Sequence, residues 1–145
     1  MSSKAQELWS RAPASHDYEA AADYLSLLLD AVTIRTIVRR LRAASPTTKK
    51  AKDLLRASRL PLLPVDDSEL VRDLRKVKKG VKLSPVLLVR GGLGGYRPLT
   101  VADGYHRICA SYHLDEDADI PCRLADLPPP KVRATPEPAA RSTRA

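Results

Sequence analysis

Ala102-Asp103-Gly104-Tyr105-His106-Arg107 is the stretch that decides the fold, because an extended segment passes there directly into a helix. Residues 96–101 predict a strand, residues 107–113 predict a helix, and residues 120–124 predict another short strand. A glycine between a strand and a helix lets the backbone approach a ligand closely and tolerates a positive φ. We therefore expect Gly104 to form a strand-to-helix turn with room for a ligand above it.

The chemistry expected at this turn is anion binding. The first turn of a helix leaves N–H groups unpaired at the positive end of the dipole. His106 and Arg107 add side-chain donors, and a guanidinium fork matches phosphate oxygens. The hypothesis therefore requires Arg107 to face the opening of the turn. The alternative is a structural turn, in which Asp103 caps the helix and Arg107 pairs with the acids of residues 115–119; Tyr105 either stacks on a base or packs.

The motif DGYHR, followed by ICASYHL and IPCRL, resembles the DG-x-HR and GERR boxes of the ParB/sulfiredoxin superfamily over about residues 60–124. A predicted strand (62–65), helix (67–79) and hairpin (85–101) precede the motif in the family's order. The resemblance implies an α+β fold, with a small mixed sheet and packed helices. It also implies a nucleoside triphosphate, ATP or CTP with Mg²⁺, whose phosphates lie at Asp103, Gly104, Tyr105, His106 and Arg107.

The chain departs from that family at several positions. Sulfiredoxin carries its catalytic cysteine where this chain has Tyr105, so sulfinic-acid reduction is not expected. Residues 64–67 are acidic where partition proteins have an arginine-rich box, and a proline-rich segment stands in place of their helix-turn-helix domain. We therefore do not carry the chromosome-segregation role over. Whether the nucleotide is hydrolysed or its phosphate transferred stays open.

An acidic cluster precedes the helix predicted over residues 67–79. Asp66 and Asp67 are candidate ligands of Mg²⁺ beside the phosphates, and Glu69 is the candidate general base for phosphoryl transfer. The alternative is helix capping, since Asp66 and Glu69 have the spacing of a capping box. Gly80 is expected to end this helix in the left-handed conformation.

The net charge of +8 is concentrated between residues 35 and 59, which hold nine basic residues and one acid, Asp53. Such a segment is either a solvated face or a site for DNA or another polyanion, bound nonspecifically through phosphates. Few aromatic residues are interspersed, so base reading is not expected. The alternative function is therefore a DNA-associated accessory protein without catalysis, using Arg35, Arg39, Arg40, Arg42, Lys49, Lys50, Lys52 and Arg56.

Two helices are predicted before the motif domain. The first spans residues 15–42, with acids in its first turn and arginines in its last. Its apolar face is broad and must pack on the α/β unit or on a second copy, giving a homodimer through residues 25–41. Ser45-Pro46 predicts the start of the second helix, over residues 47–58.

The expected organisation is a disordered segment (1–14), a basic helical extension (15–59), the motif domain (60–127) and a disordered tail (128–145). Cys109 and Cys122 are expected to be buried and reduced. No metal site is expected from His106 and His113, which lie two turns apart without a third ligand. No apolar run approaches about 18 residues, so we expect no membrane interaction and a cytoplasmic protein.

Overall fold

The computed structural model describes residues 8–91 and 98–129 and confirms the α+β class. The described helices and strands are, in chain order, α2 (Ser15–Leu25), α3 (Ala31–Ala43), β1 (Thr47–Lys50), α4 (Ala51–Ser58), α5 (Ser68–Lys78), β2 (Val86–Arg90), β3 (Thr100–Asp103), α6 (Tyr105–Leu114) and β4 (Asp119–Asp126). The strand expected over residues 96–101 begins at Thr100 in the described part, and the glycine-rich hairpin tip falls in residues 92–97, outside it.

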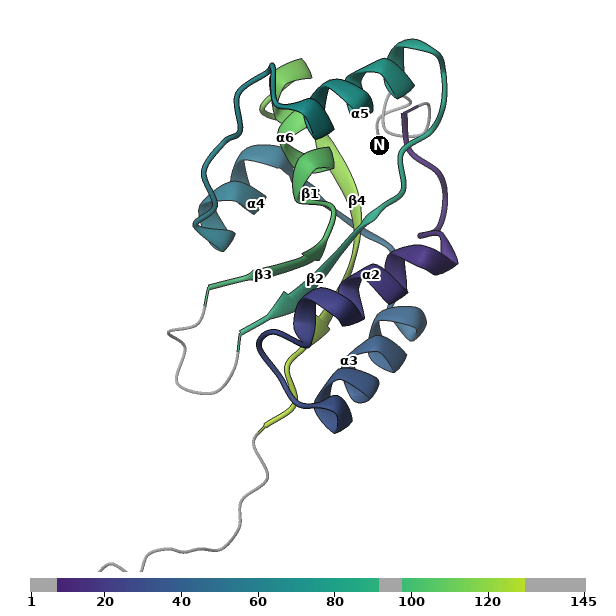
Figure 1. Cartoon of the computed structure of the whole chain (residues 1–145), viewed down its shortest axis with the longest axis vertical. Helices are drawn as coiled ribbons and strands as arrows, with labels where there is room; N and C mark the ends of the chain where they lie inside the picture. The colour runs from purple at the N-terminus through teal and green to yellow at the C-terminus, as the bar shows by residue number, and fades with distance from the viewer. Residues whose placement is uncertain (1–7, 92–97, 130–145) are drawn as a thin grey trace, which may run out of the picture.

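The strands form one mixed sheet in the order β1-β4-β2-β3 (Figure 1). β2 runs parallel to β4, while β1 pairs with β4, and β2 with β3, in antiparallel fashion. The central strand β2 has the sequence VLLVR, and its four apolar residues are all buried. A continuous apolar run of this kind is typical of a strand that is covered on both faces.

Helices cover both faces of the sheet. Val86 and Leu88 of β2 belong to a core with α4, α5 and α6, in which Leu54, Leu70 and Ile108 are buried. Successive residues of a strand point to opposite faces. Leu87 and Val89 accordingly join a second core, which is completed by three buried residues of α2 and α3: Leu25, Ile37 and Leu41.

The single helix predicted over residues 15–42 is wrong, because the chain turns between Leu25 and Ala31. Asp30 accepts a hydrogen bond from the Thr33 amide at 2.8 Å and so caps a new helix, α3. An unbroken helix of that length would extend about 42 Å, far beyond the sheet it covers. The turn instead folds α2 and α3 into an antiparallel pair on one face of the sheet (Figure 1).

The helix predicted over residues 47–58 is correct for its second part and wrong for its first four residues. Thr47–Lys50 is the edge strand β1, in register with residues 119–122 of β4, and the helix α4 starts only at Ala51. β-branched threonines favour strands. The Ala51 amide then bonds the Ala118 carbonyl at 3.0 Å. Residues 15–59 thus contribute to the same sheet and cores as the rest of the described chain, and α2 and α3 pack on the sheet, the first of the two expected alternatives.

Residues 60–67 form a loop, and the strand predicted over 62–65 is absent. This loop is held against α6, because its Pro61 and Leu63 carbonyls bond Tyr105 and His113. The cap of α5 is Asp67, not Asp66: its carboxylate accepts from the Glu69 and Leu70 amides. α5 ends as predicted, with Gly80 at φ +79°.

The disorder expected over residues 1–14 is wrong for its described part. Trp9 is 4% exposed in the core and forms a parallel bridge with Leu83. The Ser10 amide donates to the Leu83 carbonyl at 2.8 Å. An indole ring buries a large apolar area, which fixes this segment beside the sheet. Residues 1–7 and 130–145, with the rest of both predicted disordered ends, lie outside the described residues.

Both cysteines are buried and free, as predicted. Burial raises the pKa of the Cys122 thiol to about 11, and it also raises the pKa of Cys109. Among the described helices, none is long and apolar enough to span a membrane.

Candidate functional site

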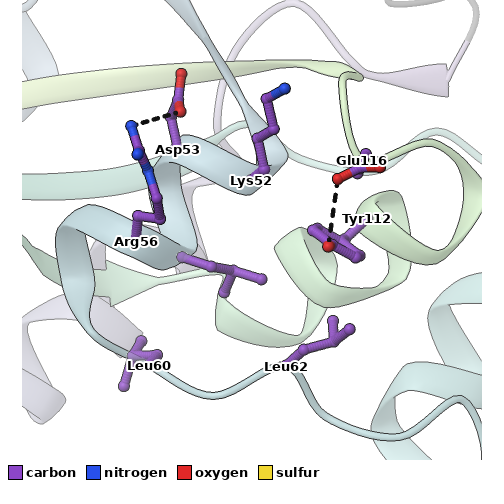
Figure 2. A pocket seen from close by; sticks show the side chains of 8 residues that line it. Lys52, Asp53, Arg56, Leu60, Leu62, Tyr112 and Glu116 are labelled. Atoms are coloured by element: carbon purple, nitrogen blue, oxygen red, sulfur yellow. Dashed lines mark hydrogen bonds and ion pairs between the residues drawn. The ribbon is translucent and has the colours of Figure 1, made fainter.

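One hollow, of about 650 Å³, lies between α4 and the C-terminal end of α6 (Figure 2). Leu55, Leu60 and Leu62 line it, and its charged groups already have partners: Arg56 pairs with Asp53 at 3.3 Å, and Lys52 with Asp117 at 2.6 Å. It lies at the opposite end of α6 from Gly104, and it holds none of the residues assigned above to phosphate.

The strand-to-helix turn is confirmed. β3 ends at Asp103, Gly104 has φ +113°, and α6 begins at Tyr105. A Cβ on Gly104 would lie 2.4 Å from Cγ1 of Val86 and 3.0 Å from Nη2 of Arg107. The turn therefore requires glycine for two reasons, its backbone conformation and its close packing against β2.

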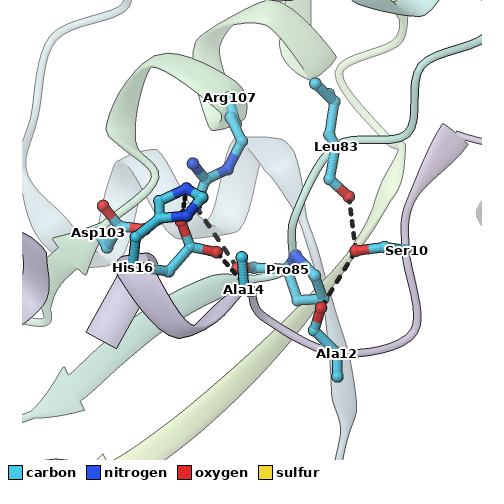
Figure 3. Close-up of polar contacts among 9 residues, drawn as sticks. Ser10, Ala12, Ala14, His16, Leu83, Pro85, Asp103 and Arg107 are labelled. Carbon is cyan, nitrogen blue, oxygen red and sulfur yellow. Dashed lines mark hydrogen bonds and ion pairs between the residues drawn. The ribbon is translucent and has the colours of Figure 1, made fainter. Parts of the chain in front are cut away.

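Arg107 faces inward, contrary to the expectation that it lines the opening of the turn. Its side chain is only 17% exposed, and Nη2 donates to Oδ2 of Asp103 at 2.9 Å and, at 3.5 Å, to the Pro85 carbonyl (Figure 3). The alternative, in which Asp103 caps the helix and Arg107 pairs with residues 115–119, is also wrong in both details, because Asp103 pairs with Arg107 and α6 has no side-chain cap. Nε is buried without a hydrogen-bond partner in the described structure. Arg107 therefore stabilises the turn from inside, and in this conformation its guanidinium is not accessible to a phosphate.

Two further carboxyl groups lie near the Asp103–Arg107 pair: Asp73, which is close to Arg107, and Asp17, which is close to Asp103. Asp103 belongs to β3, Asp73 to α5 and Asp17 to α2, and all three are mostly or fully buried. Burial raises the pKa of Asp103, even though Arg107 opposes that shift, and the neighbouring Asp17 raises it further. Burial likewise raises the pKa of Asp73, again against the field of Arg107.

Asp17 and Asp73 are site residues that the motif did not indicate. Asp73 does carry a sequence signal, because it follows Leu70 by three residues and precedes Val77 by four. It is therefore a charged residue in the middle of an apolar helical stripe. Asp17 carries no such signal. It accepts from the Ala14 amide at 2.9 Å, and its burial follows from the packing of α2 on β3.

The opening of the turn is formed by the starts of α5 and α6. α6 has no side-chain cap, and His106, in its first turn, has a 43% exposed side chain. Nε2 of His106 lies 3.9 Å from Oδ2 of Asp67, which caps α5. The Tyr105 hydroxyl donates to the Pro61 carbonyl at 2.5 Å, so this ring is fixed against the loop. His106 and the first amides of α6 are the donors left at the opening.

The acidic cluster does not assemble into a metal site. Asp67 serves as the cap of α5, Glu69 pairs with Arg72 at 3.3 Å, and Asp66 is exposed. Within residues 8–91 and 98–129, no group of three or more potential metal ligands comes together. Capping, the alternative interpretation, is confirmed for Asp67.

The sheet divides the basic segment. α3 lies on one face, α4 on the other and β1 at the edge, so the eight candidate cations do not form one continuous surface. Four of them have partners: Lys52 and Arg56 pair with acids, Arg40 donates to the Asp126 carbonyl, and Arg42 stacks on Tyr18 at 4.3 Å. The other four are exposed and have no ion pair within the described structure: Arg35, Arg39, Lys49 and Lys50.

Arg35, Arg39 and Arg42 line a second hollow, of about 480 Å³, between α2 and α3. Its floor is apolar and includes Ala22, Ile34 and Val38. This groove, on the face of the sheet opposite α5 and α6, is the largest part of the basic segment that stays together.

Comparison with known proteins adds no assignment to either surface. No protein-family model, no curated protein and no solved structure matches this chain.

Proposed function

We propose that this protein binds the phosphates of a nucleotide at the start of α6. The observation that carries the proposal is the turn itself: Gly104 in the left-handed conformation, followed by a helix whose first turn has no side-chain cap. Uncapped amides at the positive end of a helix dipole are a favourable environment for phosphate oxygens. The resemblance of DGYHR to the ParB/sulfiredoxin motif supports the same ligand.

His106 is the side chain that we assign to the phosphates. It is 43% exposed beside the uncapped amides, and Asp67 lies 3.9 Å from its Nε2. A ring N–H of His106 can donate to a phosphate oxygen at this position. The inward direction of Arg107 removes the guanidinium that the hypothesis from the sequence required at the opening. The proposal therefore rests on the amides and His106 alone, and Arg107 pairs with Asp103 inside the turn.

The preferred ligand is a nucleoside triphosphate, ATP or CTP. Because the described carboxylates do not form a metal cluster, we assign Mg²⁺ to the nucleotide's own phosphates. Asp67, whose Oδ2 lies 3.9 Å from Nε2 of His106, is the acid at the opening, and Asp66 directly precedes it in the chain. Hydrolysis or phosphotransfer is left unassigned. Glu69, the candidate base, is paired with Arg72.

Isothermal titration of the full chain with ATP, CTP and ADP, each with Mg²⁺, tests the proposal. One nucleotide should bind saturably, and His106→Ala should weaken it about tenfold through loss of a charge-assisted hydrogen bond. Arg75→Ala is the control, because it removes an exposed cation of α5 and should leave the affinity within about twofold. Absence of saturable binding, or equal affinities for His106→Ala and wild type, would overturn the proposal.

A further inference from the structure

The outer surface of the α2–α3 pair has opposite charges on its two helices. α2 presents Glu19 and Asp23, one turn apart, and α3 presents Arg35 and Arg39, also one turn apart; all four are exposed. None of these four side chains makes an ion pair in the described structure. We call the outer face of the α2–α3 pair the hairpin surface. It comprises these four charged residues and four apolar residues at the turn between the helices, Tyr24, Leu27, Leu28 and Val32.

Exposed apolar side chains gather where α2 turns into α3. Leu27 is 78% exposed, Val32 58%, Leu28 48% and Tyr24 45%. These four are half of the eight large hydrophobic side chains that are exposed among the described residues. A concentration of this kind on one end of a helix pair is typical of an interaction surface. We refer to these four residues as the apolar tip.

The acids of α2 and the arginines of α3 lie at matching heights along the antiparallel pair. The Arg42 guanidinium stacks 4.3 Å above Tyr18, which places the start of α2 beside the end of α3. Further along, Ala22 lines the same groove as Arg35 and Arg39. Because Glu19 and Asp23 directly follow Tyr18 and Ala22, they lie at these same two heights.

We propose that the hairpin surface binds a second copy of this chain in a two-fold symmetric dimer. A two-fold axis parallel to the helices keeps every residue at its own height and sets α2 against α3 of the other copy. Asp23 then faces the partner's Arg39, and Glu19 lies at the level of the partner's Arg42. The two apolar tips meet at the same end and exclude water from each other.

The charges of the hairpin surface favour a second copy of the chain over a polyanion such as DNA as the binding partner. A nucleic acid would place phosphates against Glu19 and Asp23 as well as against the arginines, and the acids would repel it. A partner that fits must present cations opposite α2 and anions opposite α3. The chain's own hairpin surface has that arrangement when rotated by the two-fold axis. The predicted homodimer through residues 25–41 thus keeps only part of its basis. Leu25, Ile34, Ile37 and Leu41 are buried on the sheet, whereas the apolar-tip residues of the same range stay exposed.

Sedimentation equilibrium of the full chain over a range of concentrations, with two charge-reversed variants, tests the dimer. Variant one is Glu19→Lys with Asp23→Lys, and variant two is Arg35→Glu with Arg39→Glu. Each variant alone places like charges across the interface, so its dimer dissociation constant should rise at least about tenfold. An equimolar mixture should restore association, because the acidic side chains at positions 19, 23, 35 and 39 of variant two then face basic side chains at those positions of variant one.

The control reverses Arg75 and Lys78, two exposed cations of α5 on the other face of the sheet, and should dimerise like the wild type. Circular dichroism of each variant confirms that it is folded. A wild type that stays monomeric at every concentration, or a mixture that associates no better than its components, would overturn the proposal. Salt-sensitive retention of DNA by a monomeric wild type, lost in variant two, would assign the arginines to nucleic acid instead.

Discussion

Arg107 and Asp103 are joined across the turn of Gly104 by a 2.9 Å ion pair, and each side chain is about one-sixth exposed. The pair links the end of β3 to the first turn of α6, with the guanidinium lying against Gly104. The arginine of the motif, Arg107, therefore stabilises the turn and does not face the opening. The amides of the first turn of α6 and the His106 side chain remain available to a ligand. Two other buried acids lie near this pair, Asp73 close to Arg107 and Asp17 close to Asp103.

Removal of Arg107 should therefore destabilise the protein. Arg107→Ala leaves the Asp103 carboxyl buried without its counter-charge, and we expect a loss of about 3 kcal/mol in the free energy of unfolding. Arg107→Met combined with Asp103→Asn should recover much of that loss, because neither residue is then charged. Urea denaturation of the three proteins measures both effects. A loss below about 0.5 kcal/mol for Arg107→Ala would show that the Arg107–Asp103 pair does not stabilise the fold.

Gly104 and Gly80 form a matched pair for a second prediction. Both have positive φ, but a Cβ on Gly104 would meet Val86 at 2.4 Å, whereas one on Gly80 meets nothing within 4 Å. Gly80→Ala should cost about 1 kcal/mol from backbone conformation alone. Gly104→Ala adds overpacking and should cost about 3 kcal/mol or more. Equal costs in urea denaturation would contradict the packing explanation; partial recovery in Gly104→Ala with Val86→Ala would support it.

The raised pKa of Asp73 predicts how stability depends on pH. In the unfolded chain, the Asp73 carboxyl titrates at about pH 4. Its folded pKa is raised by burial, so its contribution to stability is fully present below about pH 4 and is lost as pH rises through the folded pKa. Asp73→Asn cannot ionise. Its stability relative to wild type should therefore increase from about pH 4 to pH 7, and a flat difference in urea denaturation would contradict this.

Trp9 should contribute to stability although it lies close to the end of the described chain. It is 4% exposed in the core beside Leu83, and Trp9→Ala should cost about 3–5 kcal/mol in the free energy of unfolding. Val81→Ala, at a half-exposed position nearby in sequence, is the control and should change stability by less than about 0.5 kcal/mol. Equal stability of the two variants would mean that residues 8–14 do not dock on the sheet.

The parts of the fold that the sequence predicts correctly are set by local chemistry. Gly104 lies between an extended segment and a helix, and Gly80 follows α5 in the left-handed conformation. Capping of α5 by the acidic cluster is also correct, although the cap is Asp67 and not Asp66. The parts predicted wrongly depend on distant partners. Residues 47–50 become a strand because β4, about seventy residues later, pairs with them, and the turn after Leu25 is fixed by the sheet that α2 and α3 cover.

The same distinction applies to the candidate site. The motif indicates which residues lie at the turn, but the direction of the Arg107 side chain is decided by Asp103, Pro85 and the burial supplied by α2 and α5. The Tyr105 hydroxyl bonds the Pro61 carbonyl of the loop, while the side chain of the next residue, His106, stays 43% exposed. Neither outcome is encoded within the motif itself.

Amide chemical shifts of the ¹⁵N-labelled chain, titrated with ATP and with CTP in the presence of Mg²⁺, test the central claim most directly. We predict that the largest shifts fall on Tyr105, His106 and Arg107, whose amides form the first turn of α6, and that His106→Ala reduces them. Saturating shifts confined to the α2–α3 groove or to the hollow beside α4, with the start of α6 unchanged, would contradict the account.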